Sequence, residues 1–110
     1  MSFEIILTAS FKKQLRPLAK RYRSIADDLE ELGEELVRNP QAGEPLGKDC
    51  YKVRMRIRTK RTGKSGGARV ITCVKIVKER VYLLTIYDKS EQATLSDTER
   101  DNLLRENGLL

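Results

Sequence analysis

The stretch YKVRMRIR (residues 51–58) alternates apolar and cationic side chains without interruption. Successive side chains of a β-strand point to opposite faces of a sheet, so the pattern predicts a strand with one buried and one cationic face. Cations on one face lie about 6.6–7 Å apart and repel one another, and phosphates or carboxylates relieve that repulsion. We therefore expect an anion-binding row rather than the alternative, an ordinary solvated strand face. Its members are Lys52, Arg54, Arg56 and Arg58.

The positive charge of the chain is concentrated around this strand. The whole sequence carries a net charge of +6, and residues 51–80 hold 11 of its 22 lysines and arginines but only one of its 16 acidic residues. A short stretch with this charge is typical of a protein that binds a polyanion, and nucleic acid is the commonest one.

Two helices are predicted before the cationic strand. Residues 3–8 favour an opening strand, and apolar spacing from Phe11 to Tyr22 favours a helix that Pro17 should kink or end. Ser24 and Asp27 resemble a capping box for a second helix that stops at Asn39-Pro40. The outer face of this helical hairpin should be a solvated acidic surface. It comprises Asp28, Glu30, Glu31, Glu34 and Glu35.

Two more strands and a helix follow. The loop at 59–68 reverses the chain, residues 68–77 and 81–87 favour strands, and the apolar run 81–87 indicates a central strand buried on both faces. Ser96 and Glu99 form a capping box for a C-terminal helix. The order β-α-α-β-β-β-α predicts an α+β fold of one domain, residues 1–110, in which an antiparallel sheet packs against the helical hairpin.

Several classes of function are disfavoured. Gly63-Lys64-Ser65 supplies only the end of a nucleotide-binding P-loop, and a strand pattern follows it where a helix is required. The chain has no histidine, so we expect no metal and no cofactor. Cys50 and Cys73 are better explained as small buried residues than as a redox pair. We expect no membrane segment or signal peptide, and a cytoplasmic location.

Three stretches together resemble a known family. They are DCYKVR (49–54), GGARVI (66–71) and YLLTIYDK (82–89). From about residue 3 to about residue 106 the chain resembles the RelE/ParE superfamily of bacterial toxins, and it looks most like the HigB-type branch of RelE. The resemblance implies the toxin of a type II toxin–antitoxin system, acting as a ribosome-dependent messenger-RNA endonuclease. The implied partners are a cognate antitoxin, the ribosomal A site and mRNA, and the free toxin is expected to be a monomer.

The resemblance also assigns residues. The catalytic positions of the family fall on Lys52, Arg54, Arg69 and Lys89. Further RNA contacts are expected from the rest of the basic stretch and from one aromatic residue: Arg56, Arg58, Lys60, Arg61, Lys64 and Tyr87. Tyr87 is the candidate for stacking on a base, because no tyrosine follows it in the chain. Its alternative role is packing in the core.

These residues suit metal-independent cleavage, in which the 2′-hydroxyl attacks its own 3′-phosphate. The reaction needs a base, stabilisation of the phosphorane charge and an acid for the leaving oxygen. Lys52 is the expected base because neighbouring like charges favour its neutral form, and Arg54 and Arg69 are expected to hold the phosphate oxygens. Lys89 is expected to assist the leaving group. Two alternatives stay open, a ParE-like inhibitor of DNA gyrase and a non-catalytic RNA-binding module.

Overall fold

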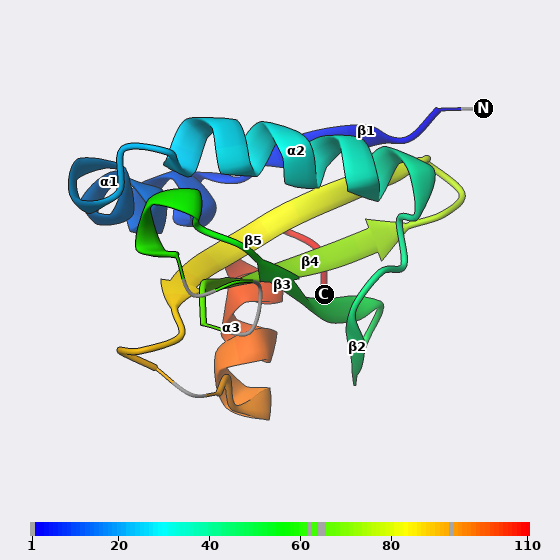
Figure 1. The fold of residues 1–110 in the computed structure, drawn as a ribbon. Coiled ribbons are helices and arrows are strands. Elements are labelled where there is room, and N and C mark those ends of the chain that lie inside the picture. Colours follow the sequence, from blue (N-terminus) through cyan, green and yellow to red (C-terminus); the bar gives the residue numbers. More distant parts are fainter. Residues whose placement is uncertain (1, 62, 64–65, 93) are drawn as a thin grey trace.

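A computed structural model describes residues 2–61, 63, 66–92 and 94–110 of the chain (Figure 1). The elements follow in the order β1 (Glu4–Leu7), α1 (Ala9–Arg21), α2 (Ile25–Arg38), β2 (Glu44–Gly47), β3 (Cys50–Met55), η1 (Arg58–Lys60), β4 (Ala68–Lys75), β5 (Arg80–Asp88) and α3 (Asp97–Glu106). The short element η1 is a 3₁₀ helix.

The strands form one sheet in the order β1-β5-β4-β3-β2, with α1 and α2 on one face and α3 on the other (Figure 1). The α+β class and the helical hairpin are confirmed. The expected antiparallel sheet is wrong at one edge, because β1 runs parallel to β5 and the sheet is mixed. The central position of the predicted strand 81–87 is confirmed, since β5 lies between β1 and β4.

The strand β2 was not expected. Its sequence EPLG contains proline and glycine, which are poor strand formers, and it pairs antiparallel with β3 at the sheet edge. Proline is tolerated there because an edge strand has one side without ladder hydrogen bonds. This strand brings Glu44 opposite Lys52.

The helical hairpin differs from its prediction in two details. Helix α1 continues through Pro17. Proline has no amide hydrogen, so one carbonyl of the preceding turn loses its helical hydrogen bond, but Pro17 is exposed and water can bond that carbonyl instead. Ser24 precedes α2 but makes no side-chain capping bond; its hydroxyl instead donates to Asp28 Oδ2 at 2.7 Å. Between the hairpin and the sheet lies the larger core, which includes Phe11, Leu18, Leu32, Leu36, Val53, Met55, Val70, Leu83 and Ile86.

The opposite face of the sheet carries α3. The capping box is confirmed, because the Ser96 hydroxyl accepts from Glu99 N and the Glu99 carboxylate accepts from Ser96 N, both at 3.1 Å. Leu104 of α3 is 1% exposed and packs in a second, smaller core. That core also contains Cys50, Ile71, Cys73, Leu84 and Tyr87. The apolar contacts of α3 therefore include Tyr87, which lies opposite Arg69, but neither Arg54 nor Arg69 itself.

A buried carboxylate joins α1, η1 and the end of β5. Asp88 is 1% exposed and accepts hydrogen bonds from Tyr22 Oη at 2.5 Å and from Lys60 Nζ at 2.6 Å. Its Oδ1 also accepts from the amide and hydroxyl of Ser90, at 2.9 and 2.7 Å. Burial alone would raise the pKa of Asp88, but the bonds from Lys60, Tyr22 and Ser90 outweigh burial and hold the pKa well below its usual range.

We predict that Asp88→Asn lowers the free energy of unfolding at neutral pH by about 3–5 kcal/mol, because Lys60 then loses its buried partner. A carboxyl pKa that is lower in the folded than in the unfolded chain stabilises the fold above about pH 4 and ceases to do so as the pH falls. The acid-induced loss of stability should therefore be shallower in Asp88→Asn. Urea denaturation at a series of pH values measures both effects. Asp27→Asn, at an exposed position of α2, is the matched control, and equal losses in the two variants would contradict the prediction.

Candidate active site

The four residues predicted to be catalytic line one pocket. It has a volume of about 570 Å³ and opens at the β2–β3–β4 side of the sheet. Its lining includes Lys52 and Arg54 from β3, Arg69 from β4, and Lys89 just after β5. Glu35 and Glu44 also line it. Residues from β2, β3, β4, helix α2 and the segment after β5 thus come together as a group of four cations and two carboxylates.

The pairing register places the two arginines face to face. Arg54 lies opposite Arg69 on β4, and Arg69 lies opposite Tyr87 on β5. Like charges directly opposite on a sheet are unfavourable. Arg69 is only 4% exposed, and burial together with the Arg54 charge lowers the pKa of its guanidinium. Arg69 Nη1 donates to the carbonyl of Ala68 at 3.1 Å, which helps to orient the side chain. An anion between the two guanidinium groups would relieve the repulsion.

Lys52 has a carboxylate partner that the sequence reading missed. Glu44 Oε2 lies 3.3 Å from Lys52 Nζ, and the lysine side chain is 23% exposed. A side chain at Gly43, which has φ of +101°, would collide with the carbonyl of Lys52, so glycine allows β2 to approach β3 here. Glu44 could not be recognised as a partner of Lys52 from the sequence, because the two residues lie opposite each other only if residues 44–47 form a strand.

Lys89 is held beside the pocket by the backbone. Its amide donates to the carbonyl of Gly67 at 3.1 Å. A Cβ at Gly67 would overlap the carbonyl of Met55, so glycine is required where the loop after η1 returns to β4. The glycine in this loop therefore serves a close approach of two backbone segments, which brings the end of β5 and Lys89 next to Arg69.

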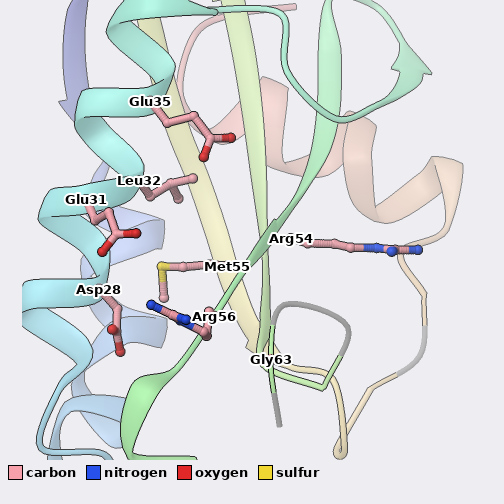
Figure 2. Close-up of a pocket in the computed structure, with 8 residues that line it drawn as sticks. All are labelled: Asp28, Glu31, Leu32, Glu35, Arg54, Met55, Arg56 and Gly63. Atoms are coloured by element: carbon pink, nitrogen blue, oxygen red, sulfur yellow. The ribbon is translucent and has the colours of Figure 1, made fainter. Parts of the chain in front are cut away.

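The cationic row predicted for residues 52–58 ends after Arg54. Met55 and Ala68 are the last paired residues of β3 and β4, so the chain beyond them is free to leave the strand direction. Figure 2 shows Arg54 directed away from α2 and Arg56 turned toward the helix, where it lines a pocket of about 260 Å³ with Asp28 and Glu31. Arg56 therefore does not share the face of Lys52 and Arg54.

Arg58 lies in η1 and contacts α2. Its guanidinium pairs with Glu31 and lies 3.8 Å from Asp28 Oδ1, while its amide donates to Asp28 Oδ2 at 3.2 Å. Asp28 is 4% exposed, so the expectation of a wholly solvated acidic face on this helix is wrong at that residue. Asp28 and Glu31, which are distant from Arg58 in the sequence, therefore balance its positive charge.

The remaining predicted RNA contacts are placed differently from one another. Lys60 pairs with buried Asp88 and lies 5.9 Å from the centre of the Tyr22 ring, so its charge has a partner within the fold. Arg61 is exposed at the end of η1 in a left-handed conformation, with φ of 59°. Lys64 lies outside the described residues. The Tyr87 ring packs in the smaller core, 8% exposed, which favours its packing role over stacking.

This arrangement can bind a phosphate and move protons. Arginines present planar forks of donors that match phosphate oxygens, and Arg54 and Arg69 offer two of these from adjacent strands. The pocket also combines a lysine–carboxylate pair with a second lysine. A carboxylate can accept a proton and an ammonium can donate one, so both functions of acid–base catalysis are present.

Residues 5–107 match the family model described as the RelE toxin of the RelE/RelB toxin–antitoxin system. The chain belongs to the RelE toxin family. It is therefore a toxin of the toxin–antitoxin type, with a cognate antitoxin as its partner. The match concerns the RelE family as a whole and does not single out its HigB-type branch.

Solved RelE structures share the fold of this RelE-family chain. A double arginine-to-alanine mutant of the E. coli RelE toxin in the free state aligns with a TM-score of 0.62 at 16% identity, covering 96% of this chain and 98% of the other. The isolated E. coli RelE toxin aligns with a TM-score of 0.55 at 18% identity, covering 96% and 99%. None of the helices in the described part of the chain has the length and apolar character to cross a membrane.

We predict that sulfate or phosphate raises the melting temperature of this RelE-family toxin relative to chloride at equal ionic strength. The anion relieves repulsion between Arg54 and Arg69, and an anion at ten times its Kd stabilises a fold by about 1.4 kcal/mol, or several degrees. Arg69→Gln should lose most of this response. Lys78→Gln removes one cation at the opposite end of β4 and should keep it. A thermal-shift titration with sulfate or phosphate measures the rise in melting temperature of each variant. Equal rises in Arg69→Gln and Lys78→Gln would show that the anion binds elsewhere.

Proposed function

We propose that this toxin is a ribosome-dependent endoribonuclease that cleaves messenger RNA and thereby inhibits translation in the cytoplasm. One observation carries the proposal: Lys52, Arg54, Arg69 and Lys89 line one pocket together with a carboxylate that pairs with Lys52. A surface that only grips an RNA backbone needs exposed cations but no buried arginine and no carboxylate among them. Membership of the RelE toxin family supports the same activity.

The arginine pair is assigned to the scissile phosphate. Arg54 and Arg69 lie opposite each other, so their guanidinium groups can donate to different oxygens of one phosphate. As the 2′-hydroxyl attacks, negative charge grows on those oxygens and the interaction strengthens in the transition state. Lys89, which lines the same pocket as Arg69, is assigned to give a proton to the leaving 5′-oxygen.

The Lys52–Glu44 pair is assigned to the 2′-hydroxyl. A lysine in an ion pair holds its proton, so within the pair the group able to accept a proton is the Glu44 carboxylate, 3.3 Å from Lys52 Nζ. In this assignment Glu44 takes the hydroxyl proton and Lys52 stabilises the attacking oxygen and the phosphate. The sequence-based alternative, in which Lys52 is itself the base, requires Lys52 to leave its carboxylate partner and lose a proton.

The ribosome supplies the substrate in the proposed reaction. The pocket has a volume of about 570 Å³ and is lined by exposed Glu44 as well as by the cations, so we assign to it a single strand of mRNA presented in the A site. Arg61 is exposed beyond η1 and can contact the backbone of messenger or ribosomal RNA. Arg58 and Lys60, which pair with carboxylates of the fold, are assigned to structure in this proposal and not to RNA.

We predict that Arg54→Ala and Arg69→Ala each lower mRNA cleavage by about 10²–10³-fold, the usual effect of removing one donor that stabilises a growing anionic charge. Primer extension on translated mRNA, after a pulse of toxin expression, measures the breaks within codons. Lys78→Ala is the matched control and should cleave at the wild-type rate. Binding of the cognate antitoxin, retained by all three variants, would show that they are folded.

Three outcomes would contradict the proposed function. Cleavage of untranslated and translated mRNA at equal rates would remove the ribosome from the mechanism. Intact mRNA together with reduced supercoiling by DNA gyrase would favour the gyrase-inhibitor alternative, whereas salt-dependent RNA binding without breaks would favour a non-catalytic module.

We predict that Glu44→Gln lowers the cleavage rate at neutral pH by about 10²-fold or more while leaving RNA affinity nearly unchanged. The amide keeps the size of the side chain and cannot accept the hydroxyl proton. Glu34→Gln, on the exposed side of α2, is the control for charge alone. Single-turnover cleavage on programmed ribosomes separates the chemical step from binding. An unchanged or faster rate in Glu44→Gln would assign the base to Lys52.

A further inference from the structure

The two cysteines of the chain face each other across the sheet. Cys50 begins β3, Cys73 lies in β4, and the pairing register places them directly opposite. They are 1% and 0% exposed and carry free thiols. The sequence favoured two small buried residues over a redox pair, because two cysteines make no disulfide framework and both lie among strand-forming residues. The fold makes them neighbours on the face covered by α3.

The ladder around this pair has the geometry that a disulfide needs. The amide of Val74 donates to the carbonyl of Asp49 at 2.9 Å, so the bond joins the residues that flank the cysteines. Cys50 and Cys73 are therefore a non-hydrogen-bonded pair, in which opposite Cα atoms of an antiparallel ladder lie about 4.5 Å apart and side chains approach most closely. Disulfides span Cα separations of about 4.4–6.8 Å, so the strands do not have to move apart to form one.

The two thiols have unequal pKa values. The neighbouring Cys73 thiol, together with burial, raises the pKa of the Cys50 thiol, while the Cys50 thiol lowers the pKa of Cys73. The Cys50 thiol also lies 3.5 Å from the carbonyl oxygen of Lys48, to which it can donate. Cys73 is consequently the better nucleophile of the two, and Cys50 keeps its proton until later.

We propose that Cys50 and Cys73 form a reversible oxidation site that closes to an intramolecular disulfide by exchange with a low-molecular-weight disulfide such as oxidised glutathione. In the first step the Cys73 thiolate attacks one sulfur of the small disulfide and releases one thiolate, leaving a mixed disulfide on Cys73. Cys50 then loses its proton and attacks Cys73 Sγ, which releases the second small thiolate. Two protein thiols are oxidised, and one small disulfide is reduced to two thiols.

The site is independent of the proposed RNA cleavage. The cysteines lie four positions from Arg54 and Arg69 along each strand, about 13 Å from the arginine pair, and the bond would join strands that are already paired there. Both cysteines are buried in the smaller core together with Leu104 of α3, and α3 is tied to the turn before β3 by the pair of Lys48 Nζ with Asp101 Oδ2 at 2.9 Å. Exchange therefore requires this core to open, which makes the site slow to respond and durable once oxidised.

The test compares disulfide formation in the folded and the unfolded toxin. The full chain is equilibrated in buffers of reduced and oxidised glutathione, once under native conditions and once in concentrated urea, and the loss of two hydrogens is measured by mass spectrometry after acid quenching. If the folded chain holds the sulfurs in disulfide geometry, the equilibrium constant should be about 30- to 900-fold larger in the native state. The oxidised protein should also melt about 5–15 °C higher.

Single-cysteine variants provide the controls. Cys50→Ala and Cys73→Ala should each bind at most one glutathione and show no rise in melting temperature. Digestion of the oxidised wild-type protein should yield one peptide pair linked through Cys50 and Cys73, which tests the assignment even if a variant folds poorly. An equilibrium constant that is equal or smaller in the folded state would overturn the proposal. So would native protein that gives only glutathione adducts or covalent dimers.

Discussion

The register between β3 and β4 decides the chemistry of both faces of this toxin. With Arg54 opposite Arg69 and Val53 opposite Val70, the cations share one face and the apolar residues share the other, against α1 and α2. A slip of β3 by one residue would turn Arg54 into the helical core and remove Val53 and Met55 from it. The cost of burying unpaired charge there is several kcal/mol per group, so the apolar layer holds the two arginines together despite their repulsion.

The basic stretch contains two kinds of cation, and their partners distinguish them. Arg58 and Lys60 bind Asp28, Glu31 and Asp88, which join η1 to α2, α1 and the end of β5. Arg54, Arg69 and Lys89 line the pocket. The first kind fixes η1 to the rest of the fold, and the second kind is positioned by the paired strands β3 and β4 and by the end of β5. A count of charges along the sequence cannot separate them, because both kinds consist of lysine and arginine.

Local patterns predicted the parts of this fold that local physics determines. The capping box at Ser96, the apolar run of β5 and the alternation through Met55 each depend on neighbouring residues, and each is present. The parts that failed depend on residues distant in sequence. Strand β1 pairs in parallel with β5, which gives β5 a hydrogen-bonded neighbour on its second side. The chain turns at Arg56 because the pairing of β3 with β4 ends at Met55 and Ala68. Glu44 was missed because it lies in β2, whose sequence EPLG does not favour a strand, and it reaches Lys52 only through the pairing of β2 with β3.

Three successive rows on one face of the sheet show how a single register can hold different chemistries. Cys50 and Cys73 form the first row, Lys52 and Ile71 the second, and Arg54 and Arg69 the third. Helix α3 covers the first row, β2 brings Glu44 to the edge of the second, and the third opens to the pocket. All three are non-hydrogen-bonded rows, since they alternate along the ladder from the bond between Val74 and Asp49, so side chains approach most closely in each of them. Close approach favours two thiols that can pair and is unfavourable for two arginines, so the same ladder geometry has opposite energetic consequences at the two ends of this face.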